Sequence, residues 1–389
     1  MDFESPPELE EFRNEVKQFI RDDIPADWKG KDDLEGDDPA AAQAIRKKLA
    51  AKGWLTLAWP KEYGGMEAPH FQQMVFNEEM SYNRIPATDN SVTMLGPILM
   101  LEGTEEQKTT FLPRIANAEM RWAQGYSEPG SGSDLASLQT RAVEDGDDFV
   151  INGTKIWTSG AHQADWIFMM ARTDPDAPKH RGISFLLADM KSPGITIRPI
   201  VNMAGVHSFN QVFFDNVRTP KKYLVGEYNR GWYVGARLLD FERSGVGRSA
   251  SGRRTLEEMV QFAKETKWNG QVLAKNPTIR NRLADMAIEI EVSRMISYHI
   301  SWLQSRGEAF NKEASMGKVF GTEMQQRLYQ TGMSMLGLYG TLERGSKWAP
   351  LQGRIERGFL SSFSATIAAG TSEIQRNIIA TRGLGLPRG

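Results

Sequence analysis

The apolar residues of this chain repeat with a helical period at both ends and with a shorter, strand-like pattern in the middle. The first predicted helix covers residues 5–22, where apolar side chains from Leu9 to Phe19 form one stripe and two prolines suit the first turn. The polar stretch 26–39 reads as a surface loop. Further helices are predicted at Ala40–Lys52, Phe71–Tyr82, Ser91–Glu102 and Glu105–Ile115.

From Thr140 the pattern becomes that of short β-strands. The predicted strands are Thr140–Val143, Asp148–Ile151, Lys155–Thr158, Trp166–Ala171, Gly182–Asp189, Ile195–Ile200 and Gln211–Phe214. Asn152-Gly153 is predicted as the hairpin turn between the second and third of them. Roughly seven strands within about 95 residues favour a small barrel or sandwich over a parallel sheet.

After Gly231 the helical pattern returns, and residues 281–306 and 308–340 are amphipathic segments that suit antiparallel bundle helices. A length of 389 residues also suggests two or three packed units. We therefore expect an α+β multidomain protein. It would have an N-terminal helical domain over residues 1–120, a central β barrel or sandwich over 121–230 and a C-terminal four-helix bundle over 231–389.

The composition narrows the possible functions. With no cysteine, the chain has no disulfide or thiolate chemistry, and its five histidines form no His-x-x-x-His pair, so no metal site is expected. A net charge near −2 predicts no nucleic-acid partner. There is no apolar run of about eighteen residues, and the acidic start is unlike a signal peptide, so we expect no membrane partner and a cytoplasmic location.

Three short motifs carry the functional signal. Trp122–Thr140, WAQGYSEPGSGSDLASLQT, is rich in glycine and serine, and such a loop can bring backbone N–H groups close to an anionic or heteroaromatic ligand. An ordinary polar turn is the alternative. The second motif is Lys155–Ser159 and the third is Gly370–Arg376. Each is weak alone, but their order and spacing are specific.

Together these motifs resemble the acyl-CoA dehydrogenase family of flavoenzymes, as do Trp59–Gly65, Gly103–Lys108 and Arg376–Ala380. The runs Asp240–Arg243 and Gly383–Arg388 are similar to a bacterial subgroup that acts on bulky acyl-CoA esters, such as steroid side chains and dicarboxylic acids. The resemblance implies a helical domain, a β domain and a helical bundle. It also implies an FAD enzyme that desaturates an acyl-CoA substrate and passes electrons to an electron-transfer flavoprotein.

The resemblance also implies the residues that hold the flavin. In the first two motifs the matching positions are Gln124, Gly125, Tyr126, Ser127, Gly132, Ser133, Trp157 and Ser159. Thr371 and Glu373 match the segment that meets the other half of the cofactor. Two alternatives stay open: Trp157 as a core side chain, and Thr371 or Ser372 as the cap of a helix, although a helix start also suits an anion.

Many relatives place the catalytic glutamate two residues before the threonine of the third motif, where this chain has Ala369. Other relatives carry it on the first helix after the β domain, which here gives Glu242. Glu242 continues an apolar helical row from Val234, and partial burial would raise its pKa. A solvated helix face is the alternative. Ser133, Asp240 and Arg243 match positions near the pantetheine chain, and the N–H of Ala369 could donate to the thioester oxygen.

Two departures from the family pattern bear on assembly. Relatives carry an Arg-x-x-Phe-Gly motif that reaches a neighbouring subunit's flavin, and this chain has Thr266–Gly270 there; Ser334–Leu338 likewise lacks the family's glutamine. We expect a homo-oligomer or a heteromer with a related subunit. Rival functions are a non-catalytic partner subunit and an oxidase or monooxygenase that reacts with O₂. His207 reads as structural.

Overall fold

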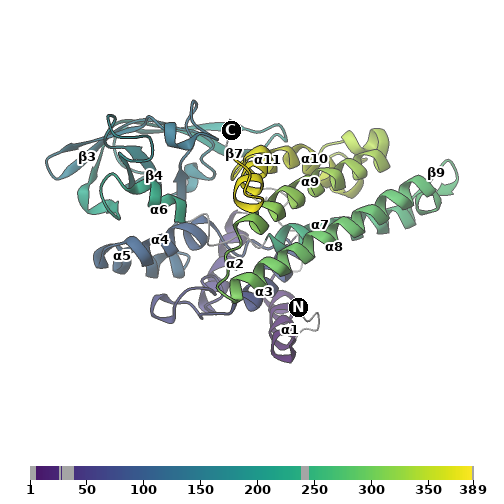
Figure 1. The fold of residues 1–389 in the computed structure, drawn as a ribbon. Helices are drawn as coiled ribbons and strands as arrows, with labels where there is room; N and C mark the ends of the chain where they lie inside the picture. The colour runs from purple at the N-terminus through teal and green to yellow at the C-terminus, as the bar shows by residue number, and fades with distance from the viewer. Residues whose placement is uncertain (1–5, 26–27, 29–38, 238–244, 388–389) are drawn as a thin grey trace. The chain divides into compact units, whose positions relative to one another are not determined.

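The computed structural model describes residues 6–25, 28, 39–237 and 245–387, and it confirms the predicted class of helices, then strands, then helices (Figure 1). Most of the predicted loop 26–39 lies outside these residues. A π-helical turn at Ser91–Leu95 precedes α4. The helices are α1 (Pro7–Asp23), α2 (Pro39–Ala51), α3 (His70–Tyr82), α4 (Gly96–Glu102), α5 (Glu105–Ala116), α6 (Gly231–Arg237), α7 (Val246–Glu265), α8 (Pro277–Ser305), α9 (Asn311–Leu336), α10 (Arg354–Ala365) and α11 (Ser372–Ile378).

The middle of the chain forms one mixed sheet in the order β6-β7-β3-β2-β4-β5-β8, with β1 paired to β4. The strands β1 and β2 run parallel to β4, and the other pairs are antiparallel. The strands are β1 (Trp122–Gly125), β2 (Arg141–Asp145), β3 (Asp148–Lys155), β4 (Trp166–Arg172), β5 (Ile183–Asp189), β6 (Ile195–Val201), β7 (His207–Pro220) and β8 (Leu224–Val225). A separate hairpin joins β9 (Lys267–Trp268) to β10 (Gln271–Val272).

The chain folds as two compact units. The sheet unit contains Asp38–Glu67 and Thr88–Glu242, and the helical unit contains Met1–Asp37, Ala68–Ala87 and Arg243–Gly389. The helices of residues 1–120 are therefore divided: α1 and α3 belong to the helical unit, whereas α2, α4 and α5 belong to the sheet unit. The domain bounds expected from the sequence stay a prediction.

The predicted hairpin turn at Asn152-Gly153 is wrong. Strand β3 continues through both residues, and the pairing of Asp145 with Asp148 places the turn at residues 146–147 instead. Gly153 marks a register shift against β7, and a side chain there would collide with Thr140, because its Cβ would lie 2.6 Å from the Thr140 Cα. Glycine at this position therefore allows a β-bulge and a close approach of the Thr140 backbone. In the sequence alone, such a glycine after asparagine cannot be told from a turn.

The sheet encloses an apolar core to which most strands contribute. The Thr219 hydroxyl of β7 donates to the Leu187 carbonyl of β5 at 2.8 Å, although these strands are not neighbours in the pairing order, so the sheet bends round on itself. Helix α6 begins on β5 at Gly231, where a Cβ would lie 2.2 Å from the Phe185 nitrogen. The buried core includes Ala142, Phe149, Ile151, Ile167, Met169, Leu186, Ala188, Val212, Phe214 and Val217.

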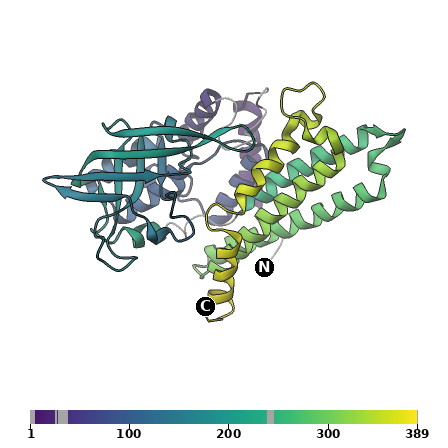
Figure 2. The ribbon, with the colours of Figure 1, turned by 90° about the horizontal axis from the view of Figure 1, so that it is seen from above.

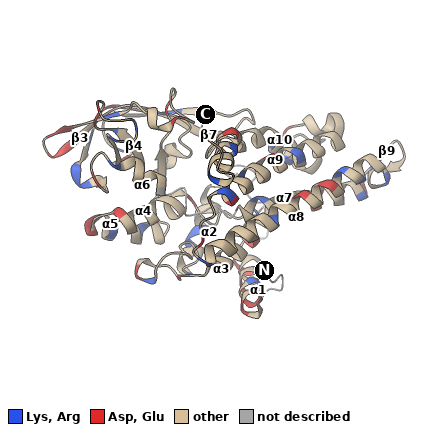
Figure 3. Ribbon diagram, in the orientation of Figure 1, with Lys and Arg blue, Asp and Glu red and all other residues tan. Residues whose placement is uncertain are grey.

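In the helical unit, α7, α8, α9 and α10 surround a core that includes Met259, Ile290 and Leu328 (Figure 2). Helix α3 packs on α7 and α8, and α1 packs on α3. Acidic and basic residues are scattered along these helices (Figure 3). Within the described ranges, no helix has both the length and the apolar character needed to cross a membrane.

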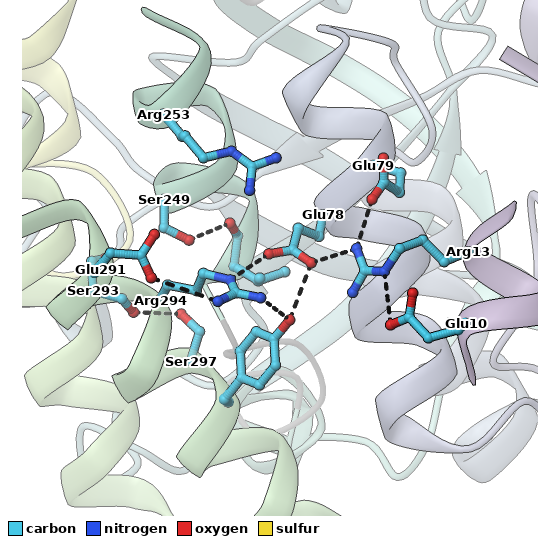
Figure 4. A network of polar contacts seen from close by, with 12 residues as sticks. Glu10, Arg13, Glu78, Glu79, Ser249, Arg253, Glu291, Ser293, Arg294 and Ser297 are labelled. Atoms are coloured by element: carbon cyan, nitrogen blue, oxygen red, sulfur yellow. Dashed lines mark hydrogen bonds and ion pairs between the residues drawn. The ribbon is translucent and has the colours of Figure 1, made fainter. Parts of the chain in front are cut away.

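A buried polar network joins α1, α3 and α8 (Figure 4). The carboxylate of Glu78 accepts from Arg13 at 2.8 Å, from Arg294 at 2.7 Å and from the Tyr298 hydroxyl at 3.1 Å. Arg13 also donates to Glu79 at 2.6 Å. Each buried charge in the network has a partner of opposite charge. The network therefore links α1 and α3 to the long helix α8 without an unpaired buried charge among these residues.

Candidate active site

The first motif begins as a strand inside the sheet unit. Strand β1 pairs in parallel with β4, which sets Gln124 beside Phe168 and Gly125 beside Met169. A Cβ at Gly125 would lie 2.8 Å from the Ile167 side chain, so close packing requires glycine there. The Gln124 side chain is partly exposed and accepts from the Asn90 amide at 3.4 Å.

A buried ion pair fastens the first motif to the second. The Nζ of Lys155, at the end of β3, donates to Glu128 Oε1 at 2.8 Å and to the Tyr126 carbonyl at 3.1 Å. Glu128 also accepts from the backbone N–H groups of Gln139 at 2.6 Å and Thr140 at 2.9 Å. Both ends of the glycine-rich loop are therefore tied to β3.

Burial and charge act against each other in this pair. Burial lowers the pKa of Lys155 to about 8, although Glu128 opposes that change. Burial acts to raise the pKa of Glu128, but the charge of Lys155 and the N–H of Gln139 outweigh it, so the pKa of Glu128 lies below its ordinary value. The pair stays ionised near pH 7 because each charge stabilises the other.

The backbone of the second motif leaves the sheet directly after Lys155. The predicted separate strand Lys155–Thr158 is wrong: Lys155 is the last residue of β3, and Trp157 has a left-handed φ of 60°, which is incompatible with a strand. Trp157 is 57% exposed, and its ring contacts Phe209 edge-on, with centroids 6.0 Å apart. This exposure excludes the alternative that Trp157 is a core side chain. An exposed indole on a fixed backbone offers the flat apolar surface on which a heteroaromatic ring can stack.

The other predicted flavin residues of the sheet unit differ in exposure: Tyr126 has a packed side chain, whereas the remaining residues are partly or fully exposed. The Tyr126 ring packs edge-on against Phe168 and Phe185, and burial raises the pKa of its hydroxyl. Tyr126 would therefore meet a ligand through its main chain. Ser127 is partly exposed, and its carbonyl accepts from the Ile156 N–H at 2.9 Å. Gly132, Ser133 and Ser159 are exposed.

These residues fit a flavin, which needs a stacking surface and hydrogen-bonding groups around its ring. A Cβ at Gly132 would meet nothing within 4 Å, so the loop has open space beside it. The buried hydroxyl of Thr158 has no hydrogen-bond partner in the described part of the chain. The sheet unit thus brings together an anchored loop, an exposed indole and polar groups in the way that the sequence predicts.

Thr371 and Glu373 lie in the helical unit, at the start of α11. The Thr371 hydroxyl accepts from the Ile374 N–H at 3.2 Å, which confirms the alternative that it caps a helix. Glu373 is exposed, and its pKa is lowered by its own backbone N–H and by the Thr371 hydroxyl. Their contact with the cofactor stays a prediction.

Ala369 and Gly370 form the turn before α11, with φ values of 53° and 83°. The side chain of Ala369 is exposed, and its carbonyl accepts from the Gln375 amide at 3.1 Å. Glu242, with Asp240 and Arg243, lies outside the described residues. The assignment of the base to Glu242 and of the substrate contacts to the other two stays a prediction.

One residue of the site was not predicted from the sequence: Asn210, a fully buried asparagine of β7 whose side chain donates to the Thr158 carbonyl at 3.0 Å. Two histidines flank it: His207 contacts its Oδ1 at 2.8 Å, and His162 contacts its Nδ2 at 3.2 Å. Asn210 lies two places before the apolar run 212–214, and a polar residue so close to such a run was the available signal. No cluster of three or more metal-ligating side chains occurs within the described ranges.

Comparison with known proteins shows the family. Three family models match the chain: acyl-CoA dehydrogenase N-terminal domain over residues 6–119, middle domain over 123–217 and C-terminal domain over 229–384. The chain is 36% identical over 393 residues to acyl-CoA dehydrogenase FadE26 of Mycobacterium tuberculosis, with 98% of each chain covered.

Solved structures agree with this assignment. The Tcur3481-Tcur3483 steroid ACAD matches with a TM-score of 0.89 and 36% identity, covering 100% of both chains. The ChsE4-ChsE5 complex of Mycobacterium tuberculosis matches with a TM-score of 0.91 and 35% identity, again over 100% of both chains. The chain therefore belongs to the acyl-CoA dehydrogenase family of FAD-dependent oxidoreductases, and its cofactor is FAD.

Proposed function

We propose that this protein desaturates an acyl-CoA thioester between its α and β carbons. When bound, FAD supplies the acceptor for the hydride that leaves the β carbon. Glu242 takes the α proton, so the products are an α,β-unsaturated thioester, a protonated Glu242 carboxyl group and the reduced cofactor. The α C–H group is a weak acid, and a positioned carboxylate with donors on the thioester oxygen is therefore needed.

The base is assigned to Glu242 because the other family position cannot serve. Ala369 has no group that accepts a proton, and it lies on the turn before α11 where many relatives carry glutamate. The Ala369 N–H can still donate to the thioester oxygen, since that role needs no side chain. Glu242 stands at the second family position.

The flavin ring is assigned to the sheet unit, at Gln124, Gly125, Ser127, Trp157 and Ser159, with the main chain of Tyr126 and the loop at Gly132 and Ser133. The observation that carries this assignment is the exposed Trp157 beside a loop that the buried Glu128–Lys155 pair fastens to β3. A rigid backbone lowers the cost of ordering the site when the ligand binds. Thr371 and Glu373 are assigned to the rest of the dinucleotide.

The substrate is assigned to the bulky acyl-CoA esters, with Ser133, Asp240 and Arg243 near the pantetheine chain. Support comes from the relative named as a steroid ACAD, which is 36% identical to this chain. We assign electron transfer from the reduced enzyme to an electron-transfer flavoprotein, as in the family.

The active assembly is assigned as a heteromer with a related chain. Two similar structures are named as pairs of proteins, Tcur3481-Tcur3483 and ChsE4-ChsE5. In this chain the segment Thr266–Gly270 contains β9 and the turn to β10, and it has no arginine to offer a neighbour's flavin. Light scattering that finds a single chain, fully loaded with FAD and active, would contradict this assignment.

The experiment is anaerobic reduction of the FAD-loaded protein by straight-chain and steroid side-chain acyl-CoA esters. We expect bleaching of the flavin absorbance and formation of the enoyl-CoA product by mass spectrometry. Glu242→Gln should lose this reaction and keep the yellow colour, whereas the matched exposed variant Glu227→Gln should keep both. A protein reduced by no ester would favour the non-catalytic subunit, and rapid reoxidation in air would favour an oxidase.

A further inference from the structure

We propose that Asn210 is a positioning residue that holds Trp157 in the conformation that receives the flavin ring. The inference rests on the proposed contact between Trp157 and the flavin. Asn210 lies on β7, 53 positions after Trp157 in the chain. In this proposal it supports Trp157 and does not itself touch the cofactor. The supporting observations are all within the sheet unit.

Asn210 makes three hydrogen bonds to Thr158, the residue after Trp157. The Thr158 N–H donates to the Asn210 carbonyl at 3.0 Å, and the Asn210 N–H donates to the Thr158 carbonyl at 3.1 Å. The Asn210 side-chain amide donates to the same Thr158 carbonyl at 3.0 Å. Both residues are fully buried, so water does not compete for these bonds. A further bond from the Gly160 N–H to the Ser208 carbonyl, at 3.2 Å, continues the attachment.

This attachment acts on a backbone that is unfavourable by itself. Trp157 is a bulky residue at φ 60°, and non-glycine residues adopt this left-handed region only when the surroundings over-determine it. Before Trp157, the ammonium group of Lys155 is held by Glu128. After it, Asn210 holds Thr158. Trp157 is thus fixed from both sides while its ring remains exposed.

Two stacked histidines determine the orientation of the Asn210 amide. The Thr158 carbonyl only accepts, so the NH₂ group of Asn210 must face it, and Oδ1 must face the other way. His207 Nε2, at 2.8 Å, therefore donates to Oδ1, and Asn210 Nδ2 donates to His162 Nδ1 at 3.2 Å. The two imidazole rings stack with centroids 4.1 Å apart. The histidines thus prevent the amide from rotating away from Thr158.

The test compares Asn210→Ser with Asn202→Ser as a matched control. Asn202 lies in the β6–β7 turn, and its side chain bonds to Ser208 and to the N–H groups of Ala204 and Val206. None of these three side-chain bonds reaches Thr158. Both substitutions remove the bonds of a partly or fully buried asparagine, so a merely structural effect would lower the melting temperature in both variants.

The first measurement is hydrogen exchange at the Thr158 amide in the apo protein. We expect Asn210→Ser to speed this exchange about tenfold or more, because opening of the segment becomes easier, and Asn202→Ser to leave it near the wild-type rate. Equal rates in wild-type protein and Asn210→Ser would overturn the positioning role without involving the flavin.

The second measurement is titration with FAD, followed by the visible absorbance spectrum of the bound flavin. Asn210→Ser should raise the Kd about tenfold, the size expected from losing one or two hydrogen bonds, and should shift the spectrum. Trp157→Ala should do the same, and Asn202→Ser should not. If Trp157→Ala alters binding and spectrum but Asn210→Ser does not, the positioning role is wrong.

If Trp157→Ala leaves FAD binding unchanged, the proposed flavin contact fails, whatever the exchange at Thr158 shows. His207→Leu keeps the inference testable if Asn210→Ser does not fold, since it removes the donor to Oδ1 and the ring that stacks on His162 but keeps the Asn210 side chain. We expect the same direction of change in exchange and Kd, smaller in size. An unchanged exchange rate at Thr158 in a folded His207→Leu protein would contradict the role of the amide.

Discussion

Glu128 and Lys155, separated by 27 positions in sequence, meet inside the sheet unit as an ion pair of 2.8 Å. The Lys155 side chain is 0% exposed and that of Glu128 is 7% exposed. This pair joins the first two of the three motifs by which the sequence resembles the family. The segments predicted to meet the flavin ring are therefore held together by Glu128 and Lys155. Neither of these two residues is itself predicted to contact the ring.

Lys155→Met should destabilise the sheet unit by about 3–5 kcal/mol, because it leaves the Glu128 carboxylate buried without its cation. Urea unfolding would measure this loss. The double variant Lys155→Met/Glu128→Gln should recover part of it, since the uncompensated charge is then removed. Lys221→Met breaks the exposed pair with Glu144 and should cost less than about 1 kcal/mol. Equal losses for the buried and exposed pairs would contradict this account.

Glu78→Gln should destabilise the helical unit by about 3 kcal/mol, because Arg13 and Arg294 then face a neutral group. Burial acts to raise the pKa of Glu78, but Arg294 and Arg13 outweigh it and lower the pKa. The stabilisation is therefore present above the unfolded value near 4.5 and is lost as pH falls through the folded pKa. Unfolding at pH 7 and pH 4 should show a smaller difference in Glu78→Gln than in wild type. Glu10→Gln, which changes an exposed carboxylate at 3.5 Å from Arg13, is the control and should behave as wild type.

Stability should also fall between pH 7.5 and pH 5.5 because of His162. Burial and the neighbouring His207 lower the pKa of His162, and its stacking on that ring opposes a second charge. In the unfolded chain His162 takes up a proton near pH 6.5, whereas in the folded protein it does so only at a lower pH. The free energy of unfolding therefore decreases as the pH drops below about 6.5. His162→Gln should flatten the pH dependence of the unfolding midpoint over this range. If the unfolding midpoint of His162→Gln changes with pH as steeply as that of wild type, His162 is not the cause of the pH dependence.

Glu242→Gln should slow single-turnover reduction of the flavin by about 10²–10⁴-fold, the range for loss of a general base, and should leave FAD binding intact. Adding Ala369→Glu to this variant should restore part of the rate, because many relatives carry their base there. Stopped-flow absorbance measures both effects. Near-normal reduction by Glu242→Gln would show that the base is another residue.

Periodicity predicted most elements because it is a local property. The helices α1, α3 and α5 and the strands β4 and β5 begin and end within about two residues of the predicted bounds, since their apolar spacing is set by one face of a helix or strand. The prediction was wrong at Asn152-Gly153, where glycine serves a bulge inside β3. Strand β7 extends to both sides of the predicted Gln211–Phe214, because its pairing with β3 and β6 continues through polar residues.

The sequence by itself determined the succession of helices, strands and helices and the family. It also placed the motifs around Ser127, Trp157 and Thr371, because these depend on residue types at fixed spacing. Only the tertiary structure decided that Trp157 is exposed in a left-handed turn, that Glu128 meets Lys155 and that Asn210 holds Thr158. Such contacts join residues that are far apart in the chain, and no periodic spacing of residues in the sequence indicates them. They exist only after the strands have paired, when burial removes the water that would otherwise satisfy each polar group.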